Sequence, residues 1–457
     1  MAKANVSARE AVERVKQSPA GKVKVAITDI DGVMRGKYIH KDKFLSAVEG
    51  GFGFCSVVFG WDASDLCYDN ARYTGWHTGY PDVVARLDLS TFREVPWDGA
   101  VPFFLGDFQD DKGGPLPICP RQLLKRVVAR LADAGFSALG SLEYEFFNFR
   151  ETPQSLAAKH HTQLQSLSPG MFGYSLIRMA QNQPYVNALF DEMGAFGVPI
   201  EGLHTETGPG VFEAAILYSD PVEAADRAVL FKTGAKEIGQ RFGIMPSFMA
   251  KWNADLPGCS GHIHQSLWDN DQRENVFFDA GHPHKISPLF EQYLAGQMHC
   301  LPDILPLFAP TVNSYKRLVE GAWAPTRVNW GLDNRTTALR VIAGSAKSTR
   351  LETRVNGSDS NPYLAMAAAL ASGLYGIEHK LRLPRGPVTG SGYADDAAPV
   401  LPSSLHEATL RFQKSELAAA LFGPAFVEHF AATRLWECRQ FAKAVTDWEL
   451  ARYFEII

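Results

Sequence analysis

The sequence predicts an α+β protein made of a small β-rich region and a larger region that mixes helices and strands. Polar and apolar residues alternate at 22–27 and again at 34–39, and an Asp-Gly turn lies between them, which is typical of a β-hairpin. The chain has 457 residues, enough for two domains. A Pro- and Gly-rich segment at 113–117 is the expected boundary, which gives domains of residues 1–112 and 113–457.

Helices and a strand are predicted in turn along the larger region. A helix begins at Pro120 and ends before Gly135, and residues 138–149 form the next strand. Asp220 is placed to cap a helix that runs to about residue 242. The apolar run at 363–377 is too short to cross a bilayer, so it predicts a buried helix.

Other segments are less regular. Residues 150–170 are polar and are expected to form a mobile loop. Residues 384–402, rich in Gly, Ser and Pro, are expected to form an irregular excursion. Ser404 then opens a capping-box pattern that predicts a helix ending near residue 423. A short N-terminal helix is expected at 5–17.

Composition narrows the class of protein. With 46% hydrophobic and 21% charged residues, the chain has the composition of a globular protein. Its net charge of -5 lacks the excess of basic residues that is typical of nucleic-acid-binding proteins. The charged N-terminus lacks the apolar core of a signal peptide, and the six cysteines form no C-x-x-C pair. We therefore expect a cytoplasmic protein without nucleic-acid or membrane partners.

The most informative stretch is residues 201–213, where three glutamates and a histidine surround a Gly-Pro-Gly turn. A sharp reversal there would bring Glu206 and Glu213 to one point. Converging carboxylates repel each other unless a cation neutralises them, and Mg²⁺ prefers carboxylate oxygens. By itself the stretch fits a metal site and a turn with solvated acids equally well.

Two pairs of residues could supply further ligands. Glu143 and Glu145 are two apart on the predicted strand at 138–149, so both side chains point to the same face. His262 and His264 repeat this spacing with imidazoles. A His-x-His pair alone is more often structural, so its meaning depends on the acids that accompany it.

A cluster of cations follows later in the chain. Glu352 and Arg354 form a third same-face pair, which a simple ion pair across strands would also explain. Arginines suit bidentate capture of carboxylate and phosphate. Two divalent ions facing arginines are the usual equipment of phosphoryl transfer from a nucleotide. The cluster consists of Lys316, Arg317, Arg327, Arg335, Arg340, Lys347, Arg350 and Arg354.

Taken in order, these motifs resemble the glutamine synthetase family. The resemblance implies an N-terminal β-grasp domain and a large catalytic domain whose antiparallel sheet forms an active-site funnel. It also implies an ATP-dependent ligase that phosphorylates the γ-carboxylate of glutamate and joins it to an amine. Such enzymes are stacked hexameric rings with sites between subunits, so a dodecamer is expected. The matching segments are Glu143-Tyr-Glu145, Glu206 with Pro209-Gly210 and Glu213, Gly261-His262-Ile-His264, Asn313 to Val319, Asn334 to Arg340, Lys347 to Arg354 and Asn361-Pro-Tyr-Leu.

The resemblance also implies roles for individual residues. The expected ligands of two or three Mg²⁺ or Mn²⁺ ions are Glu145, Glu206 and Glu213 for one ion and Glu143, His262 and Glu352 for the second. The expected contacts to glutamate and the amine are Arg317, Arg354, Gly258, His262, Trp323 and Tyr174. The expected nucleotide-side residues are Glu201, His264, Ser266, Arg340, Lys347 and Arg350. The expected catalytic residues are Arg335, Asp62, Asp65 and Trp323.

The sequence departs from the ammonia-using members at the nucleophile. Their flap carries a glutamate that takes a proton from ammonium, and Trp323 stands at that position here. Tryptophan cannot act as a base, and its ring favours a cation with a hydrocarbon body. The family's Asp-Gly-Ser-Ser loop is Asp62-Ala-Ser-Asp65, and Val211 replaces a glutamine. The sequence therefore predicts a glutamate–amine ligase similar to the γ-glutamylpolyamine and γ-glutamylalkylamide synthetases.

Two other functions stay open. One is a true glutamine synthetase with a relocated base, such as Asp62 or Asp65. The other is a structural or regulatory relative without catalysis, which the six intact ligand positions disfavour. The amine is also open: Trp323 favours an alkylamine or arylamine, whereas Asp62 and Asp65, expected to reach the neighbouring subunit's site, favour a diamine or polyamine.

Overall fold

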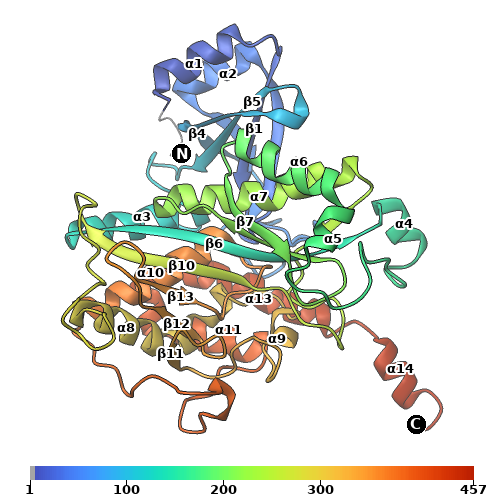
Figure 1. The fold of residues 1–457 in the computed structure, drawn as a ribbon. Helices are drawn as coiled ribbons and strands as arrows, with labels where there is room; N and C mark the ends of the chain where they lie inside the picture. Colours follow the sequence, from blue (N-terminus) through green and yellow to red (C-terminus); the bar gives the residue numbers. More distant parts are fainter. Residues whose placement is uncertain (1–5) are drawn as a thin grey trace.

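The N-terminal part of the computed structural model, which describes residues 6–457, is a five-stranded sheet with the order β2-β1-β5-β4-β3. Strands β1 and β5 are parallel and the other neighbours are antiparallel, as a β-grasp arrangement requires. Apolar residues of α1 and α2 share one core with the sheet (Figure 1). The elements are α1 (Ala8–Gln17), β1 (Lys22–Thr28), β2 (Met34–His40), α2 (Lys41–Gly50), β3 (Phe52–Cys55), β4 (Asp82–Val95) and β5 (Val101–Phe108).

The larger part contains an eight-stranded sheet with the order β11-β12-β13-β10-β6-β8-β7, and β9 pairs with β6. Neighbouring strands are antiparallel except β11 and β12, which are parallel, so the predicted antiparallel sheet is mixed at one edge. The strands are β6 (Phe136–Phe149), β7 (Ile200–Thr205), β8 (Val211–Ile216), β9 (Met245–Ser247), β10 (Gly261–Asp269), β11 (Trp330–Leu332), β12 (Leu339–Ile342) and β13 (Arg350–Thr353).

Three helices cover one face of this sheet and leave the other face for the site. α3 (Pro120–Asp133), α7 (Pro221–Arg241) and α10 (Pro362–Glu378) contact one another and the two long strands β6 and β10 (Figure 1). α10 is apolar on every side and buried along nearly its whole length, as predicted. The side chains of Tyr144 and Phe146 point toward these helices, so the alternate residues Glu143 and Glu145 point to the opposite face.

The remaining helices surround these layers. They are α4 (Pro153–Ala158), α5 (Leu176–Gln181), α6 (Gln183–Ala195), α8 (Pro288–Ile304), α9 (Ser314–Arg317), α11 (Leu405–Lys414), α12 (Glu416–Phe422), α13 (Pro424–Phe441) and α14 (Asp447–Tyr453). Within the described part of the chain, every helix is too short or too polar to span a bilayer. α14 extends away from the rest of the chain (Figure 1).

The structure corrects several local predictions. The loop expected at 150–170 contains α4, which a Thr152 capping box starts. The single helix expected to end near residue 423 is two helices, because the Ser415 side chain caps a new one. Asp220 precedes α7, but its carboxylate accepts a hydrogen bond from Gln272 instead of capping the helix. The helix expected at 5–17 begins at Ala8, and residue 5 lies outside the described residues. The division into residues 1–112 and 113–457 stays a prediction.

Candidate active site

The registers of three strands bring acids and an imidazole together on the open face of the large sheet. Glu143 of β6 lies opposite His262 of β10, and Glu145 of β6 lies opposite Glu213 of β8. Directly opposed residues of antiparallel strands point to the same face with their Cβ atoms about 5 Å apart. Four ionisable side chains therefore share one small area of the sheet.

The same row continues toward both edges of the sheet. His264 lies opposite Glu352 of β13, and Glu352 lies opposite Arg340 of β12. At the other end, His204 of β7 lies opposite Glu213. The charged row is thus a property of strand pairing, since each member is fixed by the register of its strand.

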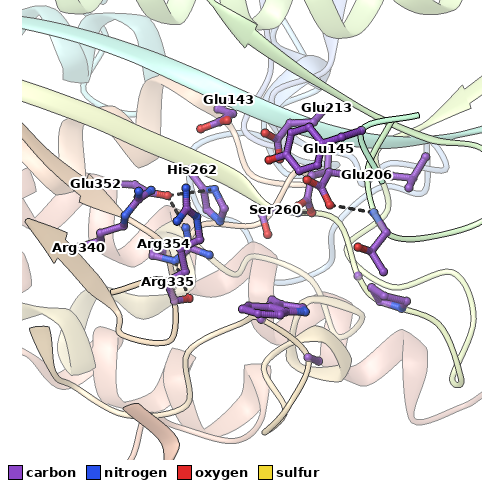
Figure 2. Close-up of a pocket in the computed structure, with 17 residues that line it drawn as sticks. Glu143, Glu145, Glu206, Glu213, Ser260, His262, Arg335, Arg340, Glu352 and Arg354 are labelled. Atoms are coloured by element: carbon purple, nitrogen blue, oxygen red, sulfur yellow. Dashed lines mark hydrogen bonds and ion pairs between the residues drawn. The ribbon is translucent and has the colours of Figure 1, made fainter. Parts of the chain in front are cut away.

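The row, apart from His204 and His264, lines the floor of a cavity of about 490 Å³. Figure 2 shows Glu143, Glu145, Glu206 and Glu213 on one side of this cavity and Glu352 among the arginines on the other. The six expected metal ligands all line it: Glu143, Glu145, Glu206, Glu213, His262 and Glu352. Of the expected substrate contacts, Arg354, Gly258, His262, Trp323 and Tyr174 line it too, as does the expected catalytic Arg335.

Glu143 and Glu213 are too close together for both carboxyl groups to be ionised at neutral pH without a cation. Burial, together with a hydrogen bond to Glu143 and the charges of Glu145 and Glu206, raises the pKa of Glu213 to about 11. Burial opposes ionisation of Glu143 as well, but hydrogen bonds from His264 and Glu213 hold its pKa well below the usual range. The pair thus shares a proton, which a bound cation would replace.

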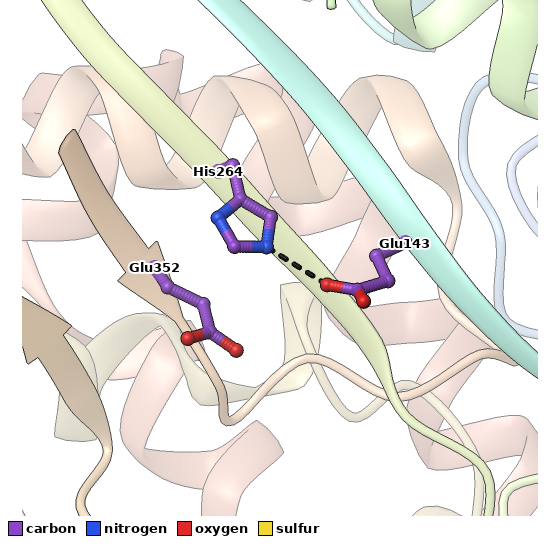
Figure 3. A group of neighbouring side chains, drawn as sticks. All are labelled: Glu143, His264 and Glu352. Carbon is purple, nitrogen blue, oxygen red and sulfur yellow. Dashed lines mark hydrogen bonds and ion pairs between the residues drawn. The ribbon is translucent and has the colours of Figure 1, made fainter. Parts of the chain in front are cut away.

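The residues present fit divalent metal ions. The ligand atoms of Glu143, His264 and Glu352 lie within 4.8 Å of one another (Figure 3), and those of His204, Glu206 and Glu213 do the same. Carboxylates with neutral imidazoles are a donor set for Mg²⁺ or Mn²⁺.

His262 strengthens this fit. Its Nδ1 lies 3.2 Å from the Glu352 Oε1, whereas its buried Nε2 has no partner among residues 6–457. Burial and the nearby Arg354 lower the pKa of His262 to about 3, so the ring is neutral. A buried nitrogen with a free lone pair at the cavity wall is the feature that a metal ion would satisfy.

The two groups of closely spaced ligand atoms are not the two ligand sets expected from the sequence, and those sets stay predictions. His264, expected on the nucleotide side, has its Nε2 2.9 Å from the Glu143 Oε2 and completes that group in place of His262. In the other group His204 stands where Glu145 was expected. Glu145 instead accepts a hydrogen bond of 2.5 Å from the backbone N–H of Ser260.

His204 is a site residue that sequence reasoning left without a role. Its Nε2 lies 3.2 Å from the Glu213 Oε1, and its ring stacks on Tyr174 with centroids 4.4 Å apart. Its position two residues before Glu206, beside the predicted turn, could have indicated a place in the site. Its pairing with Glu213 depends on a strand register that cannot be predicted from the sequence.

Arginines hold Glu352 on the other side of the cavity. The Arg340 Nη1 donates to one oxygen of Glu352 at 2.8 Å, and the Arg354 Nη1 donates to the other at 2.5 Å. Arg335 lines the cavity, and its guanidinium makes no hydrogen bond to the described residues. The cavity therefore offers an acidic half for cations and a free guanidinium for an anion.

Arg317 lies beneath the cavity and does not line it. Its buried guanidinium donates to the carbonyls of Val355 and Arg354 and to the Ser260 Oγ, at 2.9–3.1 Å. In this geometry Arg317 orders the backbone that carries Arg354 and Ser260. Direct contact of Arg317 with glutamate stays a prediction.

Comparisons with known proteins agree with this geometry. The sequence profile "Glutamine synthetase, catalytic domain" matches residues 117–453. A "Type-1 glutamine synthetase 2" of Dictyostelium discoideum is 52% identical over 449 residues, which cover 98% of this chain and 86% of that protein. A "Glutamate--isopropylamine ligase" of a Pseudomonas species is 36% identical, with 95% of each chain covered. The solved structure of a GmaS–ADP complex superposes with a TM-score of 0.85 at 26% identity, covering 97% of this chain and 99% of that one.

The chain belongs to the glutamine synthetase family. The predicted family and the predicted α+β architecture are thereby confirmed, and the protein is a ligase that forms carbon–nitrogen bonds. Use of ATP and divalent metal ions is general for this family.

The residues expected on the nucleotide side of this family member are spread along the sheet. Glu201 is exposed at a bulge of β7, and Lys347 is exposed in the turn before β13. The Arg350 Nε lies 3.2 Å from the His264 Nδ1, and the Ser266 Oγ accepts a hydrogen bond from Trp268. Arg340 also lines the cavity, so it is placed between the nucleotide side and the acids.

The mouth of the ligase cavity carries two aromatic side chains with unusual backbone. Tyr174 has φ 54° and Trp323 has φ 59°, and both side chains are largely exposed. Left-handed backbone costs a residue with a side chain about 1–2 kcal/mol. Such strain is commonly retained at functional sites, because it places a side chain that ordinary backbone would not.

Asp62 and Asp65 do not line the cavity of their own subunit. Asp62 is buried, and it accepts hydrogen bonds from the backbone of Ser64 and Leu66 and from the indole of Trp436. Asp65 is exposed and forms an ion pair of 3.0 Å with Arg35. Their expected reach into a neighbouring subunit's site therefore stays a prediction.

Proposed function

We propose that this protein joins the γ-carboxylate of glutamate to an organic amine, with γ-glutamyl phosphate formed from ATP as the intermediate. The observation that carries the proposal is Trp323, which lines the cavity at the position where the resemblance places a basic glutamate. An indole holds the hydrocarbon part of an amine but cannot take its proton. Trp323 therefore serves in recognition and not in proton transfer.

The remaining mouth residues support an organic nucleophile. Tyr174 and Trp323 are exposed there beside Ala322, and Val211 and Pro257 add apolar surface to the lining of the cavity. Ammonium would gain little from these surfaces, whereas an alkylamine or arylamine would bury its carbon atoms against them. The Pseudomonas relative carries the name of an amine ligase, which agrees with this choice.

The basic half of the cavity suits the acyl phosphate. The free guanidinium of Arg335 is available to the transferring phosphoryl group, and Arg340 and Arg354 remain in place because Glu352 holds both. When bound, divalent ions held by the acids would neutralise phosphate oxygens. The chain's own part is to fix these positive groups before the charge develops.

We propose further that the protein is a homo-oligomeric ring with sites between subunits, stacked as a dodecamer. Asp62 and Asp65 would then complete the site of the neighbouring subunit. Exposed apolar residues in and after α14, among them Trp448, Phe454 and Ile456, support burial against another copy. Light scattering should give an oligomer, and a fully active monomer would overturn this part of the proposal.

An amine panel tests the function. With saturating ATP, Mg²⁺ and glutamate, ammonia, alkylamines, arylamines and polyamines are compared by kcat/KM, and the amide product is identified by mass spectrometry. The proposal expects at least one organic amine to exceed ammonia. It fails if ammonia exceeds every organic amine.

An ammonia-using glutamine synthetase is the second candidate. It is favoured by the 52% identity to the Dictyostelium protein of that name. The same panel decides between the two functions. The absence of glutamate-dependent ADP release with every amine would instead support a relative that has lost catalysis.

A further inference from the structure

A second cavity adjoins the catalytic one at the mouth. Its volume is about 520 Å³, and Trp323 and Arg335 line both cavities. Its other walls are the loop at 332–336, which follows β11, and residues 387–390 of the segment that the sequence analysis described as an irregular excursion. A ligand held at Trp323 could therefore extend from one cavity into the other.

The wall at 387–390 is fixed by hydrogen bonds at both of its ends. The backbone N–H of Val388 donates to the carbonyl of Trp330 at 2.8 Å, and that of Gly392 donates to the Thr336 Oγ1 at 2.7 Å. Between them, the Asn334 side chain donates to the carbonyls of Val388 and Gly390. The segment has no helix or strand of its own, but it is anchored to the catalytic sheet.

These bonds occupy the amide of Asn334 and the hydroxyl of Thr336. The Asn334 Oδ1 accepts from the backbone N–H and the hydroxyl of Thr336, so both ends of the amide are used. The surfaces left for a ligand include the apolar side chains of Leu332, Pro387 and Val388 and the indole of Trp323. The built wall therefore suits hydrocarbon better than a hydrogen-bonding group.

The charges in this cavity argue against a second cation. Asp333 is the acidic residue of the wall; its Oδ1 forms an ion pair with Arg340, and its side chain is 72% exposed, so solvent screens its attraction for a ligand cation. Arg335 contributes a positive charge that has no ion-pair partner among the described residues. An ammonium group at the distal end of a diamine would face this guanidinium, and like charges repel.

We propose that the second cavity is a subsite for the uncharged tail of the amine, whose amino group reaches the catalytic cavity past Trp323. The inference rests on the proposed function and narrows its substrate class to primary amines with an alkyl or aryl tail. It also gives the 384–402 excursion a role, namely to select the nucleophile by its tail. Each methylene buried there should raise kcat/KM about fourfold.

A matched pair of amines tests the chemistry of the subsite. Pentylamine and 1,4-diaminobutane have nearly the same length and differ in a terminal methyl or ammonium group. We expect kcat/KM for pentylamine to exceed that for the diamine by at least about tenfold, and a rise from ethylamine to pentylamine. Equal or better use of the diamine, or no dependence on chain length, would overturn the proposal.

Substitutions on the anchored segment test its location. Val388→Phe and Thr389→Phe would fill the cavity, and the exposed position of Thr389 makes that variant safe for folding. Ser391→Phe adds the same ring on the same segment, at an exposed position outside the cavity lining, and is the control. The readout is the ratio of kcat/KM for pentylamine to that for ethylamine.

The proposal expects this ratio to fall at least about tenfold in both cavity-filling variants and to change less than about twofold in the control. If the variants still form organic amides with an unchanged ratio of kcat/KM for pentylamine to that for ethylamine, the subsite proposal is wrong and the proposed function is unaffected. If the wild-type protein converts no organic amine, the proposed function fails and the subsite fails with it.

Discussion

The floor and the mouth of the catalytic cavity are built in different ways. The floor, defined here as Glu143, Glu145, Glu213 and Glu352, stands on three strands whose registers fix each side chain. The mouth, defined as Tyr174, residues 319–324 and residues 387–390, consists of turns and loops, and both of its cavity-lining aromatic residues have left-handed backbone. Under the proposed function, this difference places the chemistry on the rigid sheet and the choice of amine on the loops.

This comparison separates two kinds of effect. Changes in the floor should lower the rate with every amine by the same factor, because the acyl phosphate is common to all of them. Changes in the mouth should alter the ratio between amines. A uniform loss of rate therefore assigns a residue to the floor, and a changed ratio of kcat/KM between amines assigns it to the mouth.

The largest effect is expected from Glu213→Gln. This change keeps the shape of the side chain but removes the carboxyl group of the floor that would ionise when a cation replaces its proton. We expect kcat/KM to fall by about 10³-fold with every amine, together with weaker binding of Mn²⁺. Steady-state assays and titration calorimetry measure the two quantities. The matched control is Glu49→Gln, an exposed glutamate of α2, and a loss confined to some amines would break the distinction.

Arg335→Ala tests the free guanidinium on the basic side of the catalytic cavity. The loss of a preplaced positive charge should lower kcat by about 10²-fold, equally for all amines. Arg335→Lys should recover only part of this loss, because an ammonium cannot offer two parallel hydrogen bonds. Arg335 also lines the second cavity. A loss of kcat that differs between amines would therefore show that Arg335 takes part in selecting the amine.

Trp323→Ala should give the opposite pattern. Removing the indole takes away apolar surface and a π-face, which should lower kcat/KM for organic amines about tenfold while ammonia changes less than about threefold. Trp323→Glu should raise kcat/KM for ammonia above that of the wild type, because it places a carboxylate at the flap position. Equal losses for ammonia and organic amines in Trp323→Ala would show that the residue belongs to the common chemistry.

The smallest effect is expected at a residue remote from both regions. His429 of α13 lies between Phe59 and Tyr73, and burial together with Arg434 lowers its pKa to about 4. The unfolded chain therefore binds more protons than the folded one between pH 4 and 6.5. Stability is complete above pH 6.5 and declines as the pH falls to 4, by at most about 1.4 kcal/mol per pH unit.

His429→Leu should remove this part of the pH dependence. Urea midpoints of the wild type and the variant should diverge between pH 6.5 and 4, while the ratio of kcat/KM between amines stays the same at pH 8. Parallel profiles would show that His429 is not the group responsible. The variant also measures how much a substitution in the core, remote from the floor and the mouth, changes kcat/KM indirectly.

The floor was largely predictable because strand alternation is visible in the sequence. Glu143 and Glu145 share a face on any strand, and the turn at 201–213 predicted that Glu206 and Glu213 meet. The partner of each acid was not predictable, because it depends on register. His264 and His262 are two residues apart, and only the pairing of β10 with β13 places His264 opposite Glu352.

The mouth was predictable only in part. Counting residues from Arg317 predicted that Trp323 occupies the flap position. Its location between two cavities could not be predicted in this way. The wall at 387–390 depends on hydrogen bonds to Trp330, Asn334 and Thr336, which lie more than fifty residues away in the chain. A composition of Gly, Ser and Pro indicates an irregular path but gives no information on what holds it.

A competition assay tests the central claim most directly. The enzyme receives glutamate, ATP and Mg²⁺ with equal concentrations of ammonia and pentylamine, and mass spectrometry measures the ratio of the two products. Because both nucleophiles compete for one acyl phosphate, the ratio equals the ratio of their kcat/KM values. The account predicts that γ-glutamylpentylamide exceeds glutamine. Glutamine in excess, with this amine and with every other organic amine in its place, would contradict it.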